Sequence, residues 1–224
     1  MLGFPVLLSI GLPPNVANAS NFIATMPGYA ASIPSYTTEL RSLRKSALIN
    51  VALSTVGGCI GSVLLIFGGE ALFTNLIPYL LLIATILYGL GDKIRRYFSQ
   101  PETFLNINNV WFSNSVLLIV CIYGGYFGAG LGIIMLSVLR IIGYDDFHQA
   151  NALKNVIITV ISIFSVTIFM GSSLIAWPEA LTMMVGSTIG GYQCAKFAKK
   201  IPSGYLHKFI LAFGTIATVY YFIV

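Results

Sequence analysis

The chain has 224 residues, of which 57% are hydrophobic and only 8% are charged, and its mean hydropathy is +0.87. Soluble domains carry roughly 25% charged residues, so this composition excludes a water-soluble globular protein and predicts a polytopic membrane protein. The formal net charge of +5 fits basic loops on the cytoplasmic face, and no block of basic and aromatic residues indicates binding to nucleic acid.

The first apolar run, residues 2–12, is too short to cross a bilayer, which takes about 20 residues. Together with Ala-Asn-Ala at 17–19 it looks like a secretory signal with its cleavage site. However, no Lys or Arg precedes the apolar run, and a signal peptide requires a basic start. We therefore expect residues 2–12 to stay in the protein as a half-helix.

Seven later segments have the length and apolar character of membrane-spanning helices. The first is unusually polar and contains Pro27 and Pro34, and the fourth contains a cluster of five glycines between 124 and 132. We predict an all-α polytopic membrane protein with about seven membrane segments and an N-terminal half-helix. The segments are residues 15–36, 46–67, 72–90, 113–142, 149–171, 177–195 and 204–224.

The two halves of the chain share a weak internal repeat. Ile-Gly followed by Ala-Asn-Ala occurs at 10–19 and again at 142–152. Val-Gly-x-x-Ile-Gly occurs at 56–61 and at 185–190. Chance similarity is the alternative in a sequence this rich in small residues, but the similar segment lengths favour duplication.

This repeat predicts three parts of the chain. They are a first transmembrane repeat at 1–90, a connecting loop at 91–112 and a second transmembrane repeat at 113–224. The first copy lacks the glycine-rich front half of its broken segment, so either the repeat is truncated or the start codon is misassigned.

The basic loops predict that the two repeats have opposite orientations. Loop 39–45 is basic whereas its counterpart 172–179 has no Lys or Arg, and loop 196–203 is basic where the first repeat has only Glu70. Two inverted repeats require segment 113–142 to return to the side from which it came. Its glycines allow two half-helices that meet near mid-membrane, and irregular backbone at that depth survives where it lines a cavity.

Lys154 is the most informative polar residue, because it lies inside an apolar segment. Asn151 and Asn155 share its helix face, and Asn18 and Asn21 form a similar face in the first repeat. Ionisable residues inside a membrane usually serve function, so we expect these five residues to bind an anion. The alternatives are a lysine that reaches the membrane interface and asparagines that only join helices.

The glycine cluster has two compatible interpretations. Small residues allow close packing of helices. If the backbone breaks there, the free N–H groups of a half-helix bind anions without a dedicated side chain. We therefore include Gly128, Gly130 and Gly132 in the predicted substrate site.

Catalysis is poorly supported by the sequence. His148 and His207 lie at segment edges, and no spacing of Ser, His and acidic residues suggests a triad. Asp145, Asp146 and His148 could hold a metal, but a solvated turn is the favoured interpretation. We expect no catalytic residue, no metal site and no cofactor. The widely separated Cys59, Cys121 and Cys194 are expected to be buried, without disulfides.

The sequence resembles the sulfite exporter TauE/SafE family over nearly its whole length. The resemblance is carried by GGYFGAGLGIIMLSVLRIIG followed by QANALKN, by GFPVLLSIGLPPNVANASN at the start, and by the two Val-Gly-x-x-Ile-Gly sequences. Two departures are a glycine run poorer than the family's usual one and the absence of the Pro that often follows it. The resemblance implies a multi-pass permease of the bacterial inner membrane for sulfite, organosulfonates or related sulfur-containing anions.

The expected function is therefore facilitated or potential-driven movement of a small anion through a polar cavity near mid-membrane. The expected partners are the small anionic substrate and the lipid bilayer, and we expect no binding to nucleic acid. The sequence leaves open whether the protein forms a homo-oligomer. Two alternatives remain. One is a non-transporting assembly or scaffold protein derived from a truncated permease, and the other is an intramembrane enzyme, for which we find no catalytic pair.

Overall fold

The computed structural model describes residues 3–98, 110–144 and 146–198, and residues 211, 212, 215, 216, 218 and 219 of the last segment. Every regular element in these residues is a helix, so the predicted all-α class is confirmed for the described part of the chain. The elements in order are α1 (Gly3–Ser9), α2 (Pro14–Ser32), the 3-10 turn η1 (Ile33–Tyr36), α3 (Thr37–Ser42), α4 (Arg44–Phe98), α5 (Val110–Tyr126), α6 (Leu131–Ile141), α7 (Phe147–Gly171) and α8 (Trp177–Ala198).

Two stretches of helix are long and apolar enough to cross a membrane by length and composition, Leu48–Ile86 and His148–Gly171. Val110–Tyr126 is a shorter apolar helix. The predicted number of seven segments therefore remains a prediction. The described residues of the predicted last segment, 204–224, are helical, and the rest of that segment lies outside the described residues.

Helix ends differ most from the prediction where the sequence becomes charged. The predicted loop 39–45 is largely helical, as α3 and the start of α4, and α4 continues to Phe98 although we predicted a loop from residue 91. Hydropathy marks where the apolar part ends, and Lys and Arg are good helix formers beyond it. Residues 99–109 of the predicted connecting loop and 199–203 of the predicted basic loop lie outside the described residues.

Helix α4 reverses direction at Gly69, between the predicted segments 46–67 and 72–90. Gly69 has φ 67° and ψ −179°, a backbone conformation open essentially to glycine alone. The reversal explains why Gly61 and Phe73 both contact Tyr126 of α5, since 12 residues of straight helix would separate them by about 18 Å.

Replacing Gly69 with Ala is expected to lower the free energy of unfolding by about 1–3 kcal/mol, because a Cβ strains this conformation. Crowding cannot be the cause, since no atom lies within 4 Å of the Cβ position. Gly68→Ala is the matched control, because its Cβ would meet Leu72 at an ordinary 3.5 Å. Thermal unfolding of the two detergent-solubilised variants measures the difference. Equal stability would contradict the strain assigned to Gly69.

The glycine-rich segment is broken, as predicted. Helix α5 ends at Tyr126, α6 begins at Leu131, and Gly130 between them has φ 77°. Helix α5 contacts Gly57 and Gly61 of α4 through Cys121 and Tyr126, so the two helices run in the same direction.

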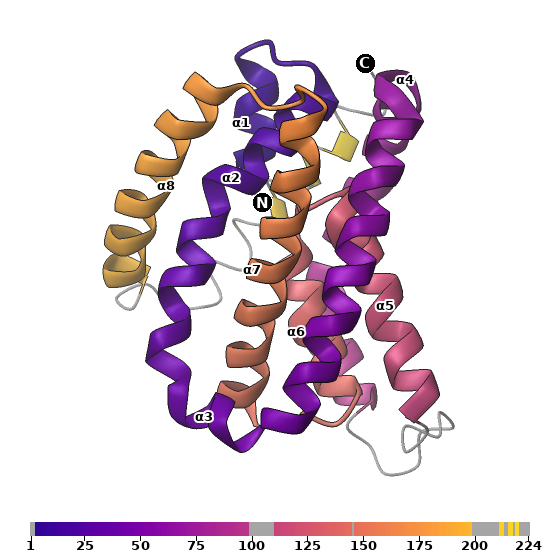
Figure 1. Cartoon of the computed structure of the whole chain (residues 1–224), viewed down its shortest axis with the longest axis vertical. Helices are drawn as coiled ribbons and strands as arrows, with labels where there is room; N and C mark the ends of the chain where they lie inside the picture. The colour runs from indigo at the N-terminus through magenta and orange to yellow at the C-terminus, as the bar shows by residue number, and fades with distance from the viewer. Residues whose placement is uncertain are drawn as a thin grey trace.

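Helix α6 leads back toward the start of α4. Asn50 Nδ2 near that start donates to Tyr144 Oη after α6 at 2.8 Å. Segment α5–α6 therefore enters and leaves at the same end of the bundle, and Figure 1 shows α7 rising from that end.

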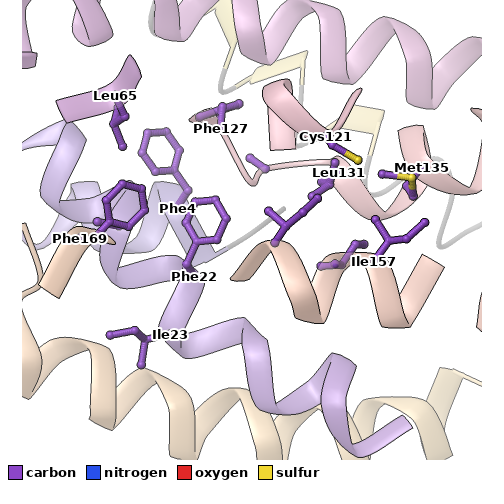
Figure 2. Close-up of a cluster of buried hydrophobic side chains, with 14 of the residues drawn as sticks. Phe4, Phe22, Ile23, Leu65, Cys121, Phe127, Leu131, Met135, Ile157 and Phe169 are labelled. Carbon is purple, nitrogen blue, oxygen red and sulfur yellow. The ribbon is translucent and has the colours of Figure 1, made fainter. Parts of the chain in front are cut away.

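The aromatic core surrounds this break. Phe4 of α1 contacts Phe127 edge-on with ring centroids 5.2 Å apart, and Phe22 of α2 contacts Phe169 of α7 at 5.7 Å. Figure 2 shows these rings clustered beside the broken segment. The core thus fixes the position of α2 and α7, the two polar helices, relative to the break.

Candidate functional site

One face of α2 carries a row of polar side chains. Asn21, Thr25 and Tyr29 follow at four-residue spacing, which places them on the same side of a helix. The Thr25 hydroxyl donates to the Asn21 backbone oxygen at 2.9 Å. This row lines two neighbouring cavities, which we call the vestibule and the chamber.

The vestibule has a volume of about 470 Å³ and lies between α2, η1, α7 and α8. Lys154 of α7 lines it, and none of its lining residues is Asp or Glu. The ammonium group therefore borders a cavity that has no carboxylate among the described residues that line it. The lining residues are Thr25, Gly28, Tyr29, Ser32, Tyr36, Asn151, Lys154, Asn155 and Ser187.

A short hydrogen-bond chain holds Lys154 at the vestibule wall. Its Nζ donates to Asn151 Oδ1 at 2.6 Å, and Asn151 Nδ2 donates to Tyr36 Oη at 2.8 Å. The chain orients the Asn151 amide between α7 and η1 and leaves Lys154 with further N–H donors, since an ammonium has three. Lys154 is half-buried and Asn155 is only 4% exposed. The structure thus places three of the predicted residues, Asn151, Lys154 and Asn155, at one cavity.

The chamber has a volume of about 110 Å³ and lies where the first turn of α6 faces α2 and α7. The N-terminal end of a helix carries partial positive charge. In this first turn, Leu131 N and Ile133 N donate to the backbone oxygens of Gly128 and Gly130 at 3.4 and 3.1 Å. The lining residues are Asn21, Phe22, Thr25, Tyr29, Gly128, Ala129, Gly130, Leu131, Gly132, Ile133, Ile158 and Ser162.

The predicted glycines of the chamber have different structural reasons. Gly130 supplies the positive φ of the break. A Cβ at Gly128 would lie 3.1 Å from the Phe22 ring, and one at Gly132 would lie 3.1 Å from Tyr29 Oη. These two glycines let aromatic side chains of α2 approach the broken backbone closely.

Asn18 does not join the other predicted residues at either cavity. Its side chain is fully buried, and Nδ2 donates to the backbone oxygen of Tyr126 at 2.9 Å. That carbonyl belongs to the last turn of α5, where carbonyls lack a donor within the helix. Asn18 therefore joins α2 to the break, as in the alternative that asparagines connect helices, and we leave it out of the contacts proposed below.

Asn21 does line the chamber, and its side chain is 7% exposed. Its Oδ1 is buried and has no hydrogen-bond partner among the described residues. A buried amide group without a full set of partners is uncommon, because leaving such an atom unpaired costs about 1–3 kcal/mol.

Sequence reasoning missed several residues of the two cavities, including Tyr29, Tyr36, Ser162 and Ser187. The four-residue spacing of Asn21 and Thr25 is the signal that would have identified Tyr29, which continues the same helix face one turn further. Ser187 lies in the second Val-Gly-x-x-Ile-Gly sequence, which the repeat had already marked.

Among the described residues, no group of three or more His, Cys, Asp or Glu side chains could hold a metal ion. The Asp146 carboxylate accepts from Gln149 N at 2.8 Å and caps the start of α7, so this residue belongs to a helix-capping turn. Asp145 and His207, and the side chain of Cys194, lie outside the described residues. Cys121 is buried and Cys59 half-buried, and both are free thiols.

Comparison with known proteins identifies a family and a relative that the chain matches. The sequence profile of the family described as sulfite exporter TauE/SafE matches residues 1–221. The chain is 26% identical over 202 residues to a protein of Haemophilus influenzae described as a "Probable membrane transporter protein", and the match covers 88% of this chain and 75% of that protein. No solved structure matches the chain significantly.

Proposed function

The chain belongs to the sulfite exporter TauE/SafE family, and on this basis we propose that it is a multi-pass permease of the bacterial inner membrane that exports small sulfur-containing anions. The family match and the relative described as a membrane transporter support a membrane permease. Sulfite or a related oxyanion as substrate is the finer part of the proposal.

The observation that carries this proposal is the position of Lys154. A cation on a membrane helix, in a cavity whose described lining residues include no Asp or Glu, supplies the positive charge that an anion needs when it loses its water. Asn151 and Asn155 stand on the same helix face and offer amide N–H groups to the anion oxygens. From there the anion passes to the chamber, where the Asn21 amide and the partial positive charge at the start of α6 replace the lysine.

Two local features support the internal repeat that such a permease would have. Gly11 and Gly143, which correspond in the repeat, both have positive φ (89° and 107°). Each ends a short helix with the same backbone bond, from Leu12 N to Leu7 O and from Tyr144 N to Leu139 O. The vestibule lies toward the end of the bundle where Arg41 of α3 and Arg44 and Lys45 of α4 occur in the chain, and the positive-inside rule places this end in the cytoplasm. The vestibule would then load anions from the cytoplasm.

The membrane potential suffices to drive export, because an anion leaving an inside-negative cell gains about 2.3 kcal/mol per charge per 100 mV, or roughly 50-fold accumulation outside. We expect purified protein in liposomes to release sulfite when a potassium diffusion potential is imposed without a pH gradient. Protein-free liposomes are the control. No flux above this control would favour the non-transporting alternative, and uphill movement driven by a pH gradient alone at zero potential would contradict potential-driven flow.

A further inference from the structure

The vestibule and the chamber share two lining residues, Thr25 and Tyr29. The Thr25 side chain is small, and its hydroxyl is held by the backbone of its own helix. Tyr29 is the larger of the two, and it lines both cavities. The direct path of an anion from Lys154 to the start of α6 therefore runs past these two side chains.

Tyr29 reaches from α2 to the first turn of α6. A Cβ built on Gly132 would lie 3.1 Å from Tyr29 Oη and 3.9 Å from Cζ, so the phenol end rests against the Gly132 backbone. The close approach depends on the absence of a side chain at position 132. The hydroxyl end of Tyr29 thus contacts the segment that forms the chamber.

The two cavities differ in the size of anion that they can hold. The vestibule, at about 470 Å³, falls within the range of ordinary small-molecule pockets, whereas the chamber, at about 110 Å³, is far below it. The vestibule therefore has room for a sulfonate with an alkyl chain, whereas the chamber suits a compact oxyanion better.

We propose that Tyr29 is a gate between two successive anion compartments and that it restricts transport to compact oxyanions of the size of sulfite. This inference rests on the proposed function. The vestibule attracts the anion through Lys154, and the chamber receives it with neutral donors after the Tyr29 ring has moved aside.

The helix that carries Tyr29 is locally weakened beside it. Pro27 lies inside α2 and has no N–H, so the carbonyl of Ile23 lacks its usual helical donor. The next residue is Gly28, and no atom lies within 4 Å of the position that a Cβ would take there. A bend of α2 at this point would carry the Tyr29 ring away from Gly132.

The first test compares sulfite with propanesulfonate, which carries an oxyanion group on a propyl chain, in wild-type and variant proteoliposomes. Wild type is expected to move sulfite in clear preference to propanesulfonate. Tyr29→Ala should raise the flux of propanesulfonate relative to sulfite by about tenfold or more, since it removes the barrier to the longer anion. Tyr29→Phe keeps the ring and should retain the wild-type preference. An unchanged preference in Tyr29→Ala would overturn the gate.

The second test does not depend on the stability of Tyr29→Ala. Gly132→Ala brings a methyl group against Tyr29 Oη and should reduce sulfite flux, whereas in Tyr29→Phe the nearest ring atom, Cζ, lies at an ordinary 3.9 Å and the same change should have little effect. Equal loss in both backgrounds would show that Gly132 acts on helix packing alone and would contradict the contact. If wild type itself moves no sulfite, the proposed function fails, whereas sulfite flux with unaltered selectivity in every variant refutes only the gate.

Discussion

Replacing Lys154 with Met is expected to weaken sulfite binding by about 10- to 150-fold, because a hydrogen bond to a charged group typically contributes about 1.5–3 kcal/mol. The fold should survive, since Met keeps the length of the apolar stem and water in the vestibule can donate to Asn151 Oδ1 in place of Nζ. Lys154→Arg should bind poorly as well, because a planar guanidinium needs more room than an ammonium and donates in a fixed direction.

Calorimetric titration of the purified variants with sulfite measures this effect. Arg41→Met removes an exposed basic residue of α3 that does not line the vestibule, and it should leave the affinity unchanged. Unchanged affinity in Lys154→Met would instead identify Lys154 as a lysine that only reaches the membrane interface.

The second large effect is expected at the contact between α4 and α5. A Cβ on Gly125 would lie 2.9 Å from both C and Cα of Gly58 and closer still to Gly58 O. Backbone atoms cannot move aside as a flexible side chain can, so Gly125→Ala must separate the two helices. The overlap also disturbs Ser62 Oγ, which lies 2.8 Å from Gly58 O and 2.7 Å from Ser165 Oγ.

We expect Gly125→Ala to destabilise the protein by about 3 kcal/mol or more, at the upper end of the range for overpacked cores. Size-exclusion profiles and thermal unfolding in detergent measure the loss of folded protein. Gly186→Ala in α8 is the matched control, because no atom lies within 4 Å of its Cβ position. A Gly125→Ala variant as stable as Gly186→Ala would mean that α4 and α5 are less tightly packed than described.

The parts of the fold that the sequence predicted are those set by local chemistry. The broken segment followed from its glycines, and Gly130 does supply the positive φ at the break. The separation of 46–67 from 72–90 followed from a gap in hydropathy, and Gly69 lies in that gap. Helix ends were less predictable because charged residues continue a helix beyond its apolar part, as in α4 up to Phe98.

The sequence predicted the candidate site only where its residues share one face of a helix. Spacing placed Asn151, Lys154 and Asn155 on one face, and all three line the vestibule. It also paired Asn18 with Asn21, but the Asn18 amide donates to the Tyr126 carbonyl that the break exposes. That contact depends on a segment more than one hundred residues away in the chain, and no local pattern reveals it.

Tyr29 illustrates a second limit of sequence reasoning. A tyrosine in an apolar segment usually packs into a core or a membrane interface, so its residue type alone does not indicate a gate. Its role depends on the space left by Gly132 and on the division between the two cavities, which arises only when α2, α6 and α7 pack together.

The most direct test of an anion permease built around Lys154 is the rate of sulfite flux through wild type and Lys154→Met, reconstituted at equal density and held at the same membrane potential. We expect wild type to give saturable flux that increases with the potential, and Lys154→Met to give little flux above that of protein-free liposomes at the same sulfite concentration. Equal flux through the two proteins, or no flux through wild type, would contradict the central claim.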